Sequence, residues 1–113
     1  MPSIFKPEIQ EVLDTLLKDI PGVVPSKAFG YPAYSIGKKM FACVYEEGVS
    51  LKLPRERIAE IMAKDSGAKE FRPMNRHTMK DWVLLIRKSP KDYLKDIALF
   101  EESAEFVVGL PEK

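Results

Sequence analysis

Residues 28–53 read AFGYPAYSIGKKMFACVYEEGVSLKL, and this stretch decides the fold. Apolar residues recur in it at every second position, which is the period of a strand that packs one face on a core. Three runs are predicted to share a face each: Tyr34 and Ile36, then Phe41, Cys43 and Tyr45, then Val49, Leu51 and Leu53. Between the runs, Gly37-Lys38 and Glu46-Glu47-Gly48 suit tight hairpin turns. The stretch predicts three sequential antiparallel strands, of which the first is kinked or at a sheet edge because it contains Pro32.

A helix is predicted before this stretch and another directly after it. Apolar residues spaced by three and four predict the first helix over about 7–19, begun by Pro7 and ended by Pro21-Gly22. A connector then runs to Pro25. The same spacing predicts the second helix over about 55–65.

The last third of the chain predicts two strands and a helix. We expect a short strand over Phe71–Met74 and a strand buried on both faces, in the middle of the sheet, over Trp82–Ile86. Ser89-Pro90-Lys91-Asp92 resembles a capping box and opens a helix over about 90–108. The predicted fold class is α+β in the order α-β-β-β-α-β-β-α, with a five-stranded antiparallel sheet and the helices packed on one face.

Length and composition exclude several classes of protein. The chain of 113 residues is predicted to form one domain, 1–113, and its net charge of +1 gives no overall field that would recruit nucleic acid or an anionic membrane. The single cysteine, Cys43, excludes an internal disulfide and a multi-thiolate zinc site. Because the N-terminus lacks a basic segment followed by an apolar run, we expect a cytoplasmic protein that does not contact a membrane.

The sequence contains no recognisable catalytic or cofactor-binding pattern. We expect no catalytic residue, no metal and no cofactor, since neither a nucleophile with a base nor a phosphate-binding glycine loop is present. The only histidine, His77, lies in a polar stretch, and Cys43 lies in a predicted strand, where a thiol behaves as a small buried hydrophobe. Glu101, Glu102 and Glu105 are predicted to form a solvated helix face.

Basic residues gather in the predicted sheet half of the chain, whereas acidic residues gather in the first and third helices. The basic residues are Lys38, Lys39, Lys52, Arg55, Arg57, Arg72, Arg76, Lys80, Arg87 and Lys88. Seven of them are the candidate contacts to nucleic-acid phosphates: Lys38, Lys39, Lys52, Arg55, Arg72, Arg76 and Lys80. Tyr31, Tyr34 and Trp82 could add stacking surfaces for unpaired bases. In the alternative interpretation these aromatic residues are core and the basic residues only keep the protein soluble.

A ligand-binding or catalytic cleft is a further hypothesis. It would be lined by Tyr31, Tyr34, Arg76, His77 and Trp82. No nucleophile or metal ligand accompanies these residues, so this hypothesis ranks below nucleic-acid binding and below a protein-binding role.

An ordered series of short motifs resembles the TfoX/Sxy N-terminal domain family, which is similar in fold to the YjbR-like proteins. The motifs are Phe29-Gly30-Tyr31-Pro32, Gly37-Lys38-Lys39-Met40-Phe41-Ala42, Leu51-Lys52-Leu53-Pro54, Phe71-Arg72-Pro73-Met74 and Met79-Lys80-Asp81-Trp82-Val83. The resemblance covers about residues 5–108. It implies a small prokaryotic cytoplasmic protein, and named members of the family regulate natural competence by assisting a transcription factor. The helical C-terminal domain of those regulators is not in this chain, and Asn75-Arg76-His77-Thr78 replaces a link that contains glycine in many relatives.

The leading functional hypothesis is therefore a regulatory or adaptor domain that binds another protein, with a role in transcription or competence regulation and with self-association through an exposed sheet edge or face. The expected partner is a protein such as the transcription machinery, or a second copy of the chain. The alternative is an accessory protein that binds nucleic acid through a basic sheet face.

Overall fold

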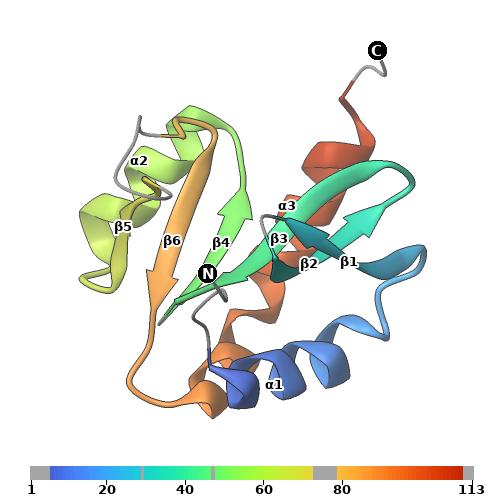
Figure 1. Ribbon diagram of the computed structural model, residues 1–113. Coiled ribbons are helices and arrows are strands. Elements are labelled where there is room, and N and C mark those ends of the chain that lie inside the picture. The colour runs from blue at the N-terminus through green and yellow to red at the C-terminus, as the bar shows by residue number, and fades with distance from the viewer. Residues whose placement is uncertain (1–5, 29, 47, 73–78, 111–113) are drawn as a thin grey trace.

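The computed structural model describes residues 6–28, 30–46, 48–72 and 79–110, which form an antiparallel sheet with helices packed against it (Figure 1). The sheet has six strands in the order β1-β2-β3-β4-β6-β5. The strands are β1 (Val23–Ala28), β2 (Tyr31–Ile36), β3 (Lys39–Tyr45), β4 (Gly48–Lys52), β5 (Ala68–Glu70) and β6 (Trp82–Ile86). All neighbouring strands pair antiparallel, so the α+β class and the antiparallel sheet are confirmed.

The predicted helices are present with small differences in their bounds. They are α1 (Pro7–Leu17), α2 (Arg55–Lys64) and α3 (Ile97–Val108). Residues Pro90–Asp96, predicted as the first turns of the last helix, form the 3₁₀ helix η2, which leads directly into α3. The predicted capping box is present, and the Ser89 N–H donates to the Asp92 carboxylate at 3.2 Å.

The prediction of five strands was wrong, because the predicted connector through Pro25 is part of β1. This strand lacks an alternating pattern and contains a proline, two features that argue against a strand in a sequence. However, β1 is an edge strand paired only with β2, and an edge strand tolerates a residue without a backbone donor. Pro32 lies in the interior strand β2, at a position paired with β1 but before the β2–β3 ladder begins at Ala33.

Two other strand predictions differ from the structure in detail. The strand predicted over Phe71–Met74 lies three residues earlier, as β5, and residues 73–78 lie outside the described part of the chain. The predicted common face of Phe41, Cys43 and Tyr45 is interrupted, because a register shift between Tyr34 and Ser35 places Phe41 in the core under the helices. The strand Trp82–Ile86 is confirmed as β6, which lies between β4 and β5 rather than in the middle of the sheet.

The two faces of the sheet carry two separate hydrophobic clusters. The larger cluster takes buried side chains from the strands and from every described helix, for example Leu13 of α1, Ile58 of α2, Tyr93 of η2 and Phe100 of α3. The helices therefore cover one face, as predicted. The opposite face carries a second cluster without any helical residue: Tyr31, Ala33, Cys43, Tyr45, Phe71 and Trp82.

A buried ion cluster ties the end of β6 to two helical segments. The Arg87 guanidinium donates to both oxygens of Asp96, at 2.8 and 3.0 Å, and to both oxygens of Asp65, at 3.1 and 2.8 Å. Asp65 follows α2 and Asp96 ends η2, so one side chain fixes both elements against the sheet. Its own exposed fraction is only 15%.

Gly67 allows the close approach of the α2–β5 turn to β6. Its carbonyl accepts from the Ile86 N–H at 2.7 Å, and a Cβ built at position 67 would lie 2.3 Å from the Ile86 carbonyl oxygen. Because backbone cannot yield as a side chain can, Gly67→Ala should lower the free energy of unfolding by roughly 3 kcal/mol. Gly37→Ala, in a turn at φ +62° with nothing within 4 Å of the added Cβ, should cost only about 1–2 kcal/mol. Urea denaturation of the two variants checks this difference, and equal losses would contradict it.

Candidate nucleic-acid interface

Basic side chains from separate elements meet at one end of the sheet, around Trp82. Lys38 lies in the β2–β3 turn, Lys39 begins β3, and Lys52 ends β4. Lys52 and Trp82 are cross-strand partners in the β4–β6 ladder, so their side chains lie on the same face. The antiparallel order thus brings together residues far apart in the sequence, and we call this region the basic end.

One hollow of the basic end contains three of the predicted phosphate contacts. It has a volume of about 330 Å³ and is lined by Lys38, Lys39, Met40, Lys52, Trp82, Val107 and Leu110. The Lys39 ammonium donates to the Leu110 carbonyl just beyond α3. The negative end of the helix dipole at the C-terminus of α3 also stabilises a cation at this position. Lys39 therefore already has a structural contact, whereas Lys38 and Lys52 line the hollow and form no ion pair with another described residue.

A second hollow lies on the other side of Trp82 and contains two more predicted contacts. Its volume is about 350 Å³, and it is lined by Arg55, Ile58, Ala59, Met62, Glu70, Met79, Lys80 and Trp82. Arg55, the first residue of α2, pairs with Asp81 at 3.0 Å in an exposed ion pair. Lys80 is exposed and makes no ion pair within the described ranges. Glu70 and Asp81 are the acidic residues close to this side of the basic end.

The remaining basic residues of the sheet half lie elsewhere. Arg72 is exposed, two residues after β5, and lines neither hollow. Arg76 and His77 lie outside the described residues. Arg57 pairs with Glu102 at 2.7 Å, and Arg87 is held by Asp65 and Asp96. The sequence pattern could not separate these ion-paired arginines from the free lysines, because their partners are distant in the chain.

The aromatic residues are not placed to stack on bases. Tyr31 and Trp82 belong to a row of rings on the face away from the helices, with centroid separations of 4.5 Å for Tyr31–Tyr45, 5.2 Å for Tyr45–Phe71 and 6.1 Å for Phe71–Trp82. Within this cluster Tyr31 is only 9% and Trp82 only 7% exposed. Stacking needs an accessible ring face, and these rings offer little of one.

Tyr34 lies on the opposite face, in the core under the helices. Its hydroxyl donates to the Asp14 carboxylate of α1 at 2.6 Å, and burial together with this contact raises the pKa of Tyr34 well above its usual value. The residues proposed for a ligand cleft are thus divided: Tyr31 and Trp82 lie on one face, Tyr34 on the other, and Arg76 and His77 outside the described part of the chain.

The sequence comparison identifies the family of this domain. The sequence model of the YjbR family matches residues 18–102, about three quarters of the chain. The chain belongs to the YjbR family. The matched region includes every residue of the two hollows except Val107 and Leu110. No curated protein and no solved structure matches the chain. The narrower TfoX/Sxy resemblance stays a prediction.

The YjbR domain offers little for catalysis in its described part. Burial raises the pKa of the Cys43 thiol to about 11, so at neutral pH it is protonated and not nucleophilic. No group of three or more His, Cys, Asp or Glu side chains that could hold a metal occurs among the described residues. Within the same residues, no helix is long and apolar enough to cross a membrane.

Proposed function

We propose that this YjbR-family domain binds nucleic acid by contacting phosphates through its basic end. The observation that carries the proposal is the meeting of Lys38, Lys39 and Lys52 in one hollow beside Trp82, with Arg55 and Lys80 on its other side. Three of these charges, on Lys38, Lys52 and Lys80, are free of ion pairs within the described ranges. Ammonium groups on flexible stems contact phosphates well, because such contacts need charge and not a fixed orientation.

The proposed binding reads the backbone of the nucleic acid and not its sequence. Phosphate contacts carry no sequence information by themselves. The rings of Tyr31 and Trp82 are buried and expose little ring surface on which a base could stack. We therefore expect weak discrimination between sequences and a preference for duplex over single strands, because a duplex presents phosphates at a higher linear density.

Salt dependence tests this proposal. If the five basic residues named above each contact one phosphate, the plot of log K against log salt concentration on duplex DNA should have a slope near −4.5, since each contact contributes about −0.9. Fluorescence anisotropy with a labelled duplex, at several salt concentrations, measures the slope. A flat dependence, or no binding at low salt, would refute the proposal.

We propose as a second function the regulatory or adaptor role that the TfoX/Sxy resemblance implies, exerted through protein–protein interaction in the cytoplasm. A groove beside α3 favours it, since its floor is apolar and it lies away from the basic end residues Lys52 and Trp82. Crosslinking and pull-down from native lysate should then return a stoichiometric partner. A pull-down that returns no stoichiometric partner, together with a monomeric mass in solution, would count against this role.

A further inference from the structure

The two hollows of the basic end differ in charge. We call the one that Lys38, Lys39 and Lys52 line the first hollow, and none of the described residues that line it is acidic. The second hollow has the carboxylate of Glu70 among its lining residues. Three ammonium groups around one hollow repel one another, and an anion bound between them would remove this repulsion. The first hollow is therefore the better place for an anion.

Contacts with α3 and the residue just beyond it hold two of these lysines in place. The hydroxyl of Ser103, which is fully buried, donates to the Lys52 carbonyl at 2.6 Å and so fixes the end of β4 that carries the Lys52 side chain. The Lys39 ammonium donates to the Leu110 carbonyl, and its charge offsets the negative end of the helix dipole, which would otherwise repel an anion. Part of the site is thus in place before a ligand binds, so that less conformational entropy is lost on binding.

Apolar side chains form the rest of the lining of the first hollow. They belong to Met40, Trp82, Val107 and Leu110. Lys39 and Lys52 are themselves half-buried beside these side chains. A hollow with charges of one sign and apolar walls concentrates the electric field, because little water is present to screen it. Such a hollow attracts a small anion of high charge more strongly than an open surface does.

A terminal phosphate of a nucleic-acid strand suits the first hollow better than an internal phosphate. An internal phosphodiester carries one charge and is joined to a sugar on both sides. A phosphate monoester carries about −1.5 to −2 at pH 7 and is joined on one side only, so it can enter a concave site with three oxygens free for ammonium groups. The volume of about 330 Å³ is roughly ten times that of a water molecule in the liquid, which is enough for a phosphate group.

We propose that the first hollow binds the terminal phosphate monoester of a nucleic-acid strand. This inference rests on the proposed nucleic-acid binding and adds that the domain prefers a phosphorylated strand end to the interior of a duplex. The three lysines of the first hollow contact the terminal phosphate. The strand then continues past Trp82, where Arg55 and Lys80 of the second hollow meet the following backbone phosphates. A duplex with hydroxyl ends still binds through its backbone phosphates, but more weakly.

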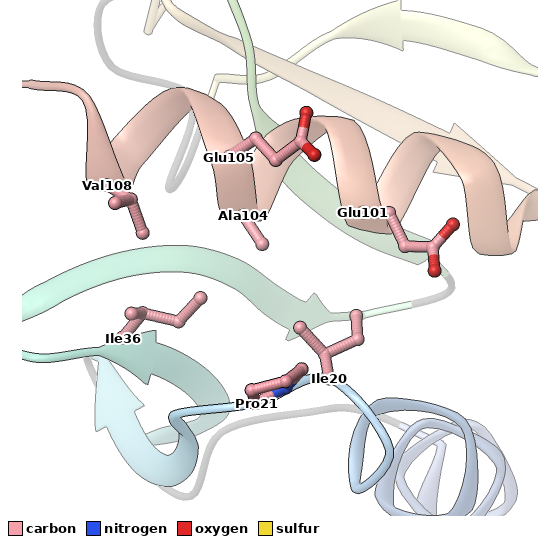
Figure 2. A pocket seen from close by; sticks show the side chains of 7 residues that line it. All are labelled: Ile20, Pro21, Ile36, Glu101, Ala104, Glu105 and Val108. Carbon is pink, nitrogen blue, oxygen red and sulfur yellow. The ribbon is translucent and has the colours of Figure 1, made fainter.

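The groove beside α3 has the opposite charge, as its lining shows (Figure 2). Ile20, Pro21 and Ile36 face α3 across this groove, and Glu101 and Glu105 are the charged residues that line it. Its volume of about 480 Å³ is larger than that of the first hollow. Because carboxylates repel a phosphate, we expect no terminal phosphate to bind there in spite of the larger volume.

Duplexes that differ only at their ends test the inference. Fluorescence anisotropy compares internally labelled duplexes with 5′-phosphate, 3′-phosphate or hydroxyl ends at about 0.1 M salt. We expect at least one phosphorylated duplex to bind about five- to tenfold more tightly than the hydroxyl-ended one, because up to one further charge is neutralised. The matched control is a hydroxyl-ended duplex that is one base pair longer. It has as many phosphate groups as the phosphorylated duplex, and its affinity should stay close to that of the shorter hydroxyl-ended duplex.

Matched variants assign the preference to one hollow. K38A/K52A removes two of the three charges around the first hollow and should abolish the preference for phosphorylated ends. R55A/K80A removes two charges from the second hollow, so it should weaken the binding of every duplex and keep the ratio between phosphorylated and hydroxyl ends. Circular dichroism verifies that both variants are folded. If both variants keep the ratio, the first hollow does not bind the terminal phosphate and the inference is wrong.

The same titrations separate this inference from the proposed function. If the hydroxyl-ended duplex binds with salt sensitivity but phosphorylated ends add no more than the longer duplex does, the inference fails and the proposed function stands. If no duplex binds at low salt, both fail. A nucleoside monophosphate that binds as tightly as the phosphorylated duplex also overturns the inference, because the first hollow then takes a free nucleotide and not a strand end.

Discussion

Arg87→Ala is expected to lower the free energy of unfolding by about 3–5 kcal/mol, the largest effect of any single substitution outside the apolar core. The change leaves Asp65 and Asp96 largely buried without the guanidinium that satisfies four of their hydrogen bonds. It also releases the end of α2 and the end of η2 from β6. Urea denaturation followed by circular dichroism measures the loss.

The matched control for this prediction is Arg55→Ala. Arg55 forms an ion pair with Asp81 at a comparable distance of 3.0 Å, but both side chains are largely exposed, so the loss should stay below about 1 kcal/mol. Similar losses in the two variants would mean that the burial of the Arg87 cluster does not matter for stability, contrary to our account.

The same cluster predicts a dependence of stability on acid. The hydrogen bonds from Arg87 hold the pKa of the Asp65 carboxyl below its usual range. A group whose pKa is lower in the folded than in the unfolded state stabilises the fold above its unfolded pKa, near about 4, and loses that contribution as the pH falls through the folded value. The wild type should therefore lose stability below about pH 4, and Arg87→Ala should show a smaller loss, in urea titrations at several pH values. Parallel pH profiles would contradict this.

The double variant K38E/K52E is expected to lower the affinity for duplex DNA by roughly 60-fold or more near 0.1 M salt. Each lost phosphate contact removes about 0.9 from the salt slope, which corresponds to a factor of about 8 at this salt concentration, and charge reversal adds repulsion. Lys38 and Lys52 are the suitable pair because Lys39 also holds the Leu110 carbonyl. Fluorescence anisotropy at fixed salt measures the change.

The control K18E/K27E carries the same change in net charge at exposed positions after α1 and in β1. If binding depends on the basic end, this control should retain affinity to within a few fold. If both variants lose affinity equally, only the net charge of the protein matters and the proposed interface is wrong.

The sequence predicted the helices and most strands because their patterns are local. The stripe of α1, the capping box at Ser89 and the apolar run of β6 each depend on residues within one turn or one strand. The edge strand β1 was not predicted, because the apolar and polar residues of Val23–Ala28 do not alternate and the segment includes Pro25. The register shift at Tyr34/Ser35 could not be predicted either, because it depends on how β2 and β3 pair.

The candidate site was predictable in composition but not in geometry. The sequence indicated that basic residues gather in the sheet half, and the antiparallel order places Lys38, Lys39 and Lys52 together. Which basic residues are free was not predictable, because the partners of Arg57 and Arg87 come from distant elements.

An amide-resolved NMR titration of the labelled domain with a short DNA duplex, at low and at physiological salt, tests the central claim most directly. The account predicts chemical-shift changes confined to residues 38–39, 52–55 and 80–82, at one end of β3, β4 and β6, that diminish as salt rises. Shifts concentrated on α1 or α3, or no shifts at low salt, would contradict nucleic-acid binding at the basic end.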